Sequence, residues 1–254
     1  MILLHRISPF VLLPVLLAGM YFIIFVQKYP VAIAIAMVVV GIFVFARLLS
    51  FEIRTFQFWH FVMTPILFLV ASLGMIFFLE QELVILVIAI TSTALVILYA
   101  EYVFQYLHLP SIYQPYSLEY LSLFLNLLTV FYLSSVGFGS ILLLQTSLVA
   151  VSVVAFLCFA FVIYGTFWVS KAHESKIKPY TYGGSILMTE FFVSVSFLPS
   201  GFYTNAAIMT ILFYVFIGLT RAHVLRTLSA PVVKRYLIIS GVLLIATLLS
   251  SQWL

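Results

Sequence analysis

Apolar segments long enough to cross a lipid bilayer follow one another along almost the whole sequence. A membrane-crossing helix needs roughly 17–25 mostly apolar residues. We expect nine such segments, with eight as the alternative count, at residues 8–26, 30–49, 59–79, 83–102, 118–133, 140–169, 182–198, 203–219 and 236–249. Because lipid offers the backbone no hydrogen-bond partners, each segment should be a helix, and the expected fold class is all-α, a polytopic transmembrane helix bundle.

The scarcity of charge argues against a soluble fold. Hydrophobic residues make up 65% of the chain and charged residues 7%, with a mean hydropathy of +1.29, whereas a soluble domain carries about 25% charged residues. Residues 1–254 are therefore expected to form a single transmembrane domain with no soluble domain. Two serines and two glycines at residues 134–139 predict a break, after which residues 140–169 would form a helix of about 45 Å.

The basic residues lie almost entirely between the apolar segments, and this predicts the orientation of the chain. With the N-terminus inside, ten of the 11 Lys and Arg fall on the cytoplasmic side, and Lys28 alone faces the other side with Glu80 and Glu82. This bias predicts an integral protein of the cytoplasmic (inner) membrane, N-terminus in and C-terminus out. The same topology explains the net charge of +4, so nucleic acid is not an expected partner.

Two basic connections are candidate sites for phosphate or for an anionic lipid headgroup on the cytoplasmic side. Their residues are Lys171, Lys176, Lys178, Arg221, Arg226, Lys234 and Arg235. The alternative is that these charges only set the topology. The lipid bilayer, with anionic lipids, and other membrane subunits are the expected partners.

The apolar segment after the first basic connection carries one carboxyl group, Glu190, near its middle. An ionisable side chain at this depth costs about 3 kcal/mol or more, so it should be paired inside the protein or be functional. At about 100° per residue, Glu190 and Ser194 share one side of a helix. We expect this side, and the adjacent side with Ser185, Thr189 and Ser196, to face the bundle interior, with Ile186, Met188 and Phe192 towards lipid. Glu190 is then either a proton- or cation-linked site or a structural hydrogen-bonding group.

A second polar stripe offers a partner for Glu190. Its residues recur at spacings of three and four in one predicted helix and are Glu119, Ser122, Asn126 and Thr129. Asn126 lies near the middle of its segment, so packing of the two helices would satisfy both side chains. Gln145, expected in the following helix, is a third candidate. The alternative is that the stripe serves helix packing alone.

Between Tyr99 and Tyr120 the sequence gathers six of its 15 tyrosines with acidic and amide side chains and no Lys or Arg. The candidate residues are Glu101, Tyr102, Gln105 and His108. Aromatic rings and carboxylates together suit an amine or another cation. The alternative is an aromatic belt at the membrane interface.

The residue types used most often in catalysis are scarce. The chain has no aspartate, one cysteine (Cys158, interpreted as a buried apolar side chain) and five histidines, none spaced on one helix like a metal or haem pair. We therefore expect no metal and no cofactor. No phosphate-binding or dinucleotide-binding motif occurs either.

Three classes of function remain. The first is a non-catalytic membrane component, either a scaffold or a subunit of a complex. The second is a small transporter or channel that uses Glu190 with Asn126. The third is an enzyme acting on a lipid-linked or anionic-lipid substrate at the cytoplasmic face, with Glu101, Glu119 or Glu190 as base. The scarcity of catalytic residue types favours the first class and argues against an enzyme.

Overall fold

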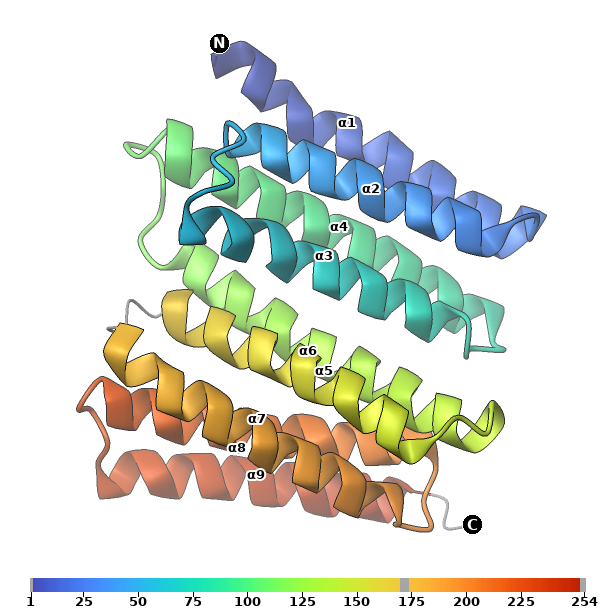
Figure 1. Cartoon of the computed structure of the whole chain (residues 1–254), viewed down its shortest axis with the longest axis vertical. Coiled ribbons are helices and arrows are strands. Elements are labelled where there is room, and N and C mark those ends of the chain that lie inside the picture. Colours follow the sequence, from blue (N-terminus) through green and yellow to red (C-terminus); the bar gives the residue numbers. More distant parts are fainter. Residues whose placement is uncertain (1, 170–173, 252–254) are drawn as a thin grey trace. The chain divides into compact units, whose positions relative to one another are not determined.

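The computed structural model describes residues 2–169 and 174–251 of the chain (Figure 1). The described elements are α1 (Ile2–Tyr21), the π-helical turn η1 (Phe22–Val26), α2 (Pro30–Leu48), α3 (Phe56–Ile76), α4 (Glu82–His108), α5 (Ser117–Leu143), α6 (Leu148–Val169), α7 (Glu174–Ser196), α8 (Phe202–Val224) and α9 (Ala230–Ser250). Over these residues the expected all-α bundle is confirmed. Eight of the helices are long and apolar enough to cross a membrane, which indicates an integral membrane protein.

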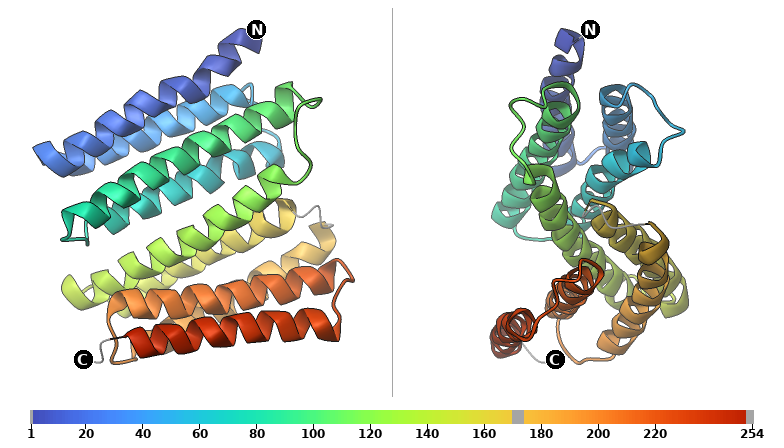
Figure 2. Two further views of the ribbon diagram at one scale, coloured as in Figure 1. Left: turned by 180° about the vertical axis from the view of Figure 1, so that it is seen from behind. Right: turned by 90° about the vertical axis from the view of Figure 1, so that its left-hand side faces the viewer.

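The remaining helix is α7, whose lysines, glycines and hydroxyl side chains lower its hydropathy. It nevertheless packs against α6 and against α8. Helices that are consecutive in this group run antiparallel to each other (Figures 1 and 2). Packing therefore holds α7 against two apolar helices.

The helices form two compact units, Met1–Leu125 and Asn126–Leu254, and α5 contributes to both. In the first unit α1 packs against α2 and α4, and α3 also packs against these two helices. Large aromatic side chains fill its core, because Phe45, Phe68 and Tyr99 are fully buried. The rings of Phe45 and Tyr99 meet edge to face with their centroids 6.0 Å apart.

In the second unit the closest packing joins α6 and α7, while α8 packs on α7 and α9 on α8. Glycines permit two of these approaches: Gly184 of α7 lies against Phe216 of α8, and Gly218 of α8 lies against Tyr236 of α9. The outermost helix, α9, buries only Ser240, so the rest of its apolar surface is available to lipid.

The break expected at residues 134–139 is wrong. Helix α5 continues through this stretch to Leu143, and the turn to α6 lies at residues 144–147. The serines fit into the helix because their hydroxyls bond to its own backbone, as when Ser135 Oγ donates to the carbonyl oxygen of Phe131 at 2.9 Å. In a transmembrane helix, serine and glycine are tolerated where neighbouring groups satisfy the backbone. The single long helix expected after the break is accordingly absent.

Gly184→Leu should loosen α7 from α8, because any side chain there would overlap Phe216 and lie 3.3 Å from Ile163 Cδ1. Overpacking of this kind costs about 1–3 kcal/mol. A Cβ at Gly183 meets no atom within 4 Å, so Gly183→Leu is a matched control. We expect G184L to lower the unfolding temperature in detergent by about 2–4 °C per kcal/mol lost, and G183L to leave it nearly unchanged. Equal unfolding temperatures for the two variants would contradict this packing.

Candidate functional site

Glu190 lies in an open groove between α6 and α7 with a volume of about 810 Å³. The groove is lined by Leu148, Val149, Ser152, Val153 and Phe156 of α6 and by Ile186, Thr189, Glu190, Val193 and Ser194 of α7. These α6 residues belong to the first half of the apolar segment Leu148–Phe167. At a rise of about 1.5 Å per residue, the groove lies within roughly 12 Å of the end where α6 begins. Glu190 itself lies six residues, or roughly 9 Å, before the end of α7 at Ser196.

The side of α7 that carries Glu190 and Ser194 faces outward, contrary to expectation, although Ser185 on the adjacent side is buried. Glu190 and Ser194 are exposed, whereas Met188 and Phe192, expected to face lipid, are 0% and 1% exposed. The larger apolar side chains fill the space against neighbouring helices, since the ring of Phe192 stacks on Phe138 of α5 with centroids 4.3 Å apart. The hydroxyls need no second helix, because Ser194 Oγ donates to the backbone oxygen of Glu190 at 2.8 Å.

The carboxylate of Glu190 has no partner in the part of the chain that the structure describes. It accepts no hydrogen bond there and forms no ion pair. The other residues that line the groove are apolar or carry a hydroxyl. All three of these hydroxyls are already engaged. Ser194 Oγ donates to Glu190 O, as described above, Ser152 Oγ donates to Leu148 O at 2.7 Å and Thr189 Oγ1 donates to Ser185 O at 2.7 Å.

Asn126 and Glu190 are not brought together. Asn126 Nδ2 donates to Thr166 Oγ1 on α6 at 2.9 Å, and both side chains are buried. Thr166 Oγ1 in turn donates to the carbonyl oxygen of Val162 at 2.8 Å. The amide is therefore satisfied between α5 and α6, while the carboxylate lies on the exposed side of α7.

The polar residues of the α5 stripe contact different parts of the structure and do not form one site. Ser122, which is buried, lies beside the hydroxyl of Tyr99 in the first unit. Glu119 Oε2 accepts a hydrogen bond from Tyr113 Oη at 3.0 Å. Thr129 is buried in the second unit. None of these contacts leads towards Glu190.

The placement of Gln145 in a helix is wrong. Gln145 lies in the turn between α5 and α6 with a φ of 54°, and its side chain is exposed. Its Nε2 donates back to the carbonyl oxygen of Leu142 at 3.0 Å. It caps the end of α5 and takes no part in an intramembrane cluster.

The stretch rich in tyrosine is stabilised by contacts between its own residues. Helix α4 continues to His108, so Gln105 lies one turn from Glu101 and donates to its Oε1 at 3.1 Å. The ring of His108 stacks on Phe104 with centroids 5.1 Å apart. Tyr102, on the same helix, is half-buried.

Tyr113 ties the loop after α4 to the start of α5. It donates to Glu119, and its hydroxyl also accepts a hydrogen bond from the backbone N–H of Leu118 at 3.2 Å. Burial raises the pKa of Tyr113 to about 12, and the neighbouring Glu119 adds to this shift. The phenol therefore stays protonated and holds Glu119 as an acceptor, which makes that carboxylate part of the loop structure.

The cationic candidates lie near helix ends. Lys178, Arg226, Lys234 and Arg235 are exposed and Arg221 is half-buried. Lys171, and the side chain of Lys176, lie outside the described residues. The guanidinium of Arg235 lies 5.8 Å from the ring centroid of Tyr236. Among the described residues, no group of three His, Cys, Asp or Glu side chains is placed to hold a metal ion.

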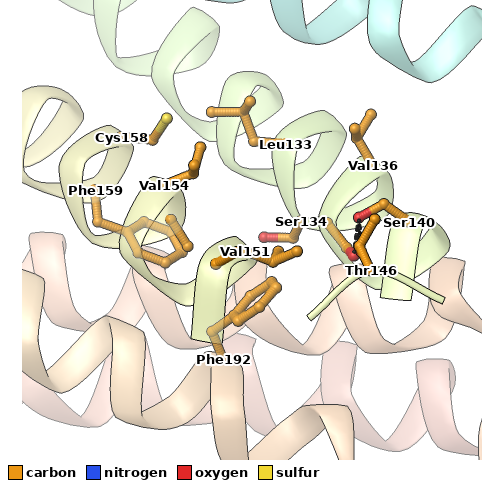
Figure 3. Close-up of a pocket in the computed structure, with 13 residues that line it drawn as sticks. Leu133, Ser134, Val136, Ser140, Thr146, Val151, Val154, Cys158, Phe159 and Phe192 are labelled. Carbon is orange, nitrogen blue, oxygen red and sulfur yellow. Dashed lines mark hydrogen bonds between the residues drawn. The ribbon is translucent and has the colours of Figure 1, made fainter. Parts of the chain in front are cut away.

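A cavity between α5 and α6 was not foreseen from the sequence (Figure 3). It measures about 330 Å³ and is lined by Leu133, Ser134, Val136, Gly137, Ser140, Thr146, Ala150, Val151, Val154, Ala155, Cys158, Phe159 and Phe192. Small residues recur at helical spacing on both walls. Such a pattern usually indicates close packing of two helices, so it gives no signal of a space between them. Cys158 lies in the wall and is only partly buried.

A scan against protein-family models, a search of curated proteins and a search of solved structures found no match to this chain. The function must therefore be inferred from the residues themselves.

Thr166→Val should destabilise the second unit, because it leaves the amide of Asn126 buried without its acceptor. Hydrogen bonds between transmembrane helices contribute about 0.6 kcal/mol on average and up to about 1.7 kcal/mol. In a double-mutant cycle with Asn126→Leu, measured by unfolding in mixed micelles, we expect a coupling in this range. Thr247→Val, which removes a hydroxyl that bonds to its own helix on a half-buried residue, is the control and should have little effect. A coupling of zero would contradict the contact.

Proposed function

We propose that the protein is a non-catalytic component of a membrane complex, and that the groove at Glu190 receives one transmembrane helix of a partner. The observation that carries this proposal is an exposed carboxylate, in a groove otherwise lined by apolar and hydroxyl side chains, with no partner in the described chain. A charged side chain at the centre of a transmembrane helix costs about 2.5–3.5 kcal/mol, and a position closer to the helix end, such as Glu190, bears part of that cost. A partner that supplies a counter-charge or a hydrogen-bond donor would remove this cost.

The chemistry of the groove defines the partner. The carboxylate would bind a Lys or Arg side chain, or a neutral hydrogen-bond donor, at the same height on the partner helix. Serine and threonine beside Glu190 leave room for close approach of that helix. A second copy of this chain fits less well, because a symmetric contact through the groove would place the two Glu190 carboxylates opposite each other.

The other two classes of function receive less support. A transport site built from Glu190 and Asn126 would need the two side chains to meet, and Asn126 is instead bonded to Thr166. An enzyme using Glu101 or Glu119 as base would need a free carboxylate, and these two accept hydrogen bonds from Gln105 and Tyr113.

We also infer the orientation N-terminus in and C-terminus out. The distribution of Lys and Arg supports it. Moving the turn between α5 and α6 to residues 144–147 leaves that count unchanged, because this turn carries no charge.

Binding of a designed transmembrane peptide tests the groove. A labelled poly-Leu helix with one Lys placed at the depth of Glu190 should bind the reconstituted protein at least about tenfold more tightly than its all-Leu counterpart, equivalent to about 1.4 kcal/mol. Energy transfer in vesicles measures the affinity. Glu190→Gln should remove most of the preference, whereas Glu80→Gln, at an exposed loop position, should retain it.

A peptide with the Lys moved by two helical turns is the register control and should bind like the all-Leu peptide. Equal binding of the Lys and Leu peptides to the native protein would reject the partner-helix proposal. Proton flux into vesicles that is lost in Glu190→Gln would favour the transporter instead.

Single-cysteine variants in a Cys158→Ser background test the orientation. Gln145→Cys and Ser250→Cys should react with a membrane-impermeant maleimide added outside intact cells, because both positions are exposed at the expected outer side. Ser229→Cys, exposed between α8 and α9, should react only after permeabilisation. Labelling of Ser250→Cys only after permeabilisation, with Gln145→Cys labelled outside, would mean that one of the helices after α5 does not cross.

A further inference from the structure

The second unit carries its positive charge at one end. Residues 126–254 contain seven Lys and Arg and two acidic residues, Glu174 and Glu190, and no acidic residue follows Glu190. Glu190 lies near the end of α7. The described cations of the unit lie at the opposite end, where α7 begins, α8 ends and α9 begins (Figure 1), and they are Lys178, Arg221, Arg226, Lys234 and Arg235. This end of the unit therefore attracts anions.

An open groove runs along α9 at this end and has one cation in its lining. Its volume is about 590 Å³, and it is lined by Ala230, Val233, Lys234, Leu237 and Ile238. Their spacings of three and four residues place them along one side of the helix. Lys234 lies roughly 6 Å along the axis from the start of α9 at Ala230. The groove is therefore cationic near the start of the helix and apolar further along it.

The surface of α9 stays open beyond the apolar end of the groove. Gly241 follows Leu237 by one turn on the same side of the helix, and a Cβ at Gly241 would meet no atom within 4 Å. Helix α9 buries only Ser240 among its described residues, so protein atoms do not cover this side. A flexible hydrocarbon chain can extend along such a surface.

Lys234 differs from the neighbouring Arg235 in its surroundings. The guanidinium of Arg235 lies 5.8 Å from the ring centroid of Tyr236, and Arg235 does not line the groove. Lys234 forms no hydrogen bond or ion pair with a described residue. Adjacent residues of a helix are about 100° apart around its axis. The two cations are therefore directed to different sides of α9, and Lys234 is the one available to a ligand in the groove.

A ligand for this groove needs an anionic group next to an apolar chain. A phospholipid with a net negative charge has this combination, because its phosphate can pair with an ammonium group at the interface while its acyl chain stays in the apolar layer. A soluble anion would leave the apolar part of the groove uncovered. We propose that the groove binds one anionic phospholipid, with its phosphate at Lys234 and an acyl chain along Leu237, Ile238 and Gly241.

This lipid site is separate from the partner-helix groove. The partner-helix groove is formed by α6 and α7, whereas the lipid site lies on α9, which packs on α8. Glu190→Gln should therefore leave lipid binding at α9 unchanged, and each of the two sites can fail its test without the other.

Photo-crosslinking in vesicles tests the site. The reconstituted full chain receives a trace of phosphatidylglycerol or of phosphatidylcholine, each with a diazirine in one acyl chain, in a background of unlabelled phosphatidylcholine. Phosphatidylglycerol carries a net negative charge, and phosphatidylcholine carries none. We expect peptides covering residues 230–242 to be labelled at least about threefold more by phosphatidylglycerol, because its headgroup is attracted to Lys234.

Lys234→Gln and Arg235→Gln remove the same charge from adjacent positions. Lys234→Gln should bring the labelling by the two lipids close to equal, because it removes the cation that lines the groove. Arg235→Gln is the matched control and should retain the preference for phosphatidylglycerol, because Arg235 lies against Tyr236 outside the groove.

Ile238→Trp and Ile239→Trp test the apolar part of the groove. The two residues are 53% and 40% exposed, so both variants should fold, and circular dichroism checks their helix content. The indole at position 238 fills the groove and should lower the labelling by phosphatidylglycerol at least about threefold. The indole at position 239 lies outside the groove and should leave this labelling unchanged.

Two results would overturn the proposal. Equal losses of preference in Lys234→Gln and Arg235→Gln would show that the total charge of this end attracts the lipid, without a site at Lys234. Equal labelling of residues 230–242 of the native protein by the two lipids would show that α9 contacts lipid without selecting an anionic headgroup.

Discussion

The architecture depends on one constraint: in an apolar layer every polar group must find a hydrogen-bond partner nearby. A hydroxyl can meet this requirement on its own helix by donating to the carbonyl oxygen one turn back. Helix α7 does so repeatedly, through Thr181, Ser185, Thr189 and Ser194. A helix rich in hydroxyls then packs like an apolar helix with small side chains. Its buried side then combines large apolar residues, Met188 and Phe192, with a hydroxyl residue, Ser185.

Glu190 differs, because an ionised carboxylate cannot form such a hydrogen bond to the backbone of its own helix. An ionised carboxylate only accepts hydrogen bonds, and inside a helix the backbone N–H groups are already used. Glu190 therefore needs a donor from outside α7, and none of the described residues supplies one. Asn126 differs from Glu190 because its amide can donate a hydrogen bond, and it donates one to Thr166 on the neighbouring helix. The difference between the two side chains is the physical basis for proposing a partner helix at one and a structural role for the other.

Helix α6 connects these features by presenting different residues to different neighbours. One side packs on α7 around the groove, and another lines the cavity towards α5. Ser134 departs from the local bonding seen at Ser135, and it does so where protein atoms leave a space.

Hydropathy alone determined the all-α class, the membrane location and the existence of most helices, because the penalty for exposing backbone in lipid acts on each segment separately. It also identified Glu190 and Asn126 as the polar residues to explain. The sequence did not predict where α5 ends. Serine and glycine, as at residues 134–139, tend to end a helix in water, but inside a helix bundle the hydroxyl groups bond to the helix backbone and the helix continues. Only the tertiary structure decided which side of α7 is buried, that Asn126 pairs with Thr166, and that small residues on α5 and α6 border a cavity. These outcomes depend on how side-chain volumes from several helices fit together, and no single segment carries that information.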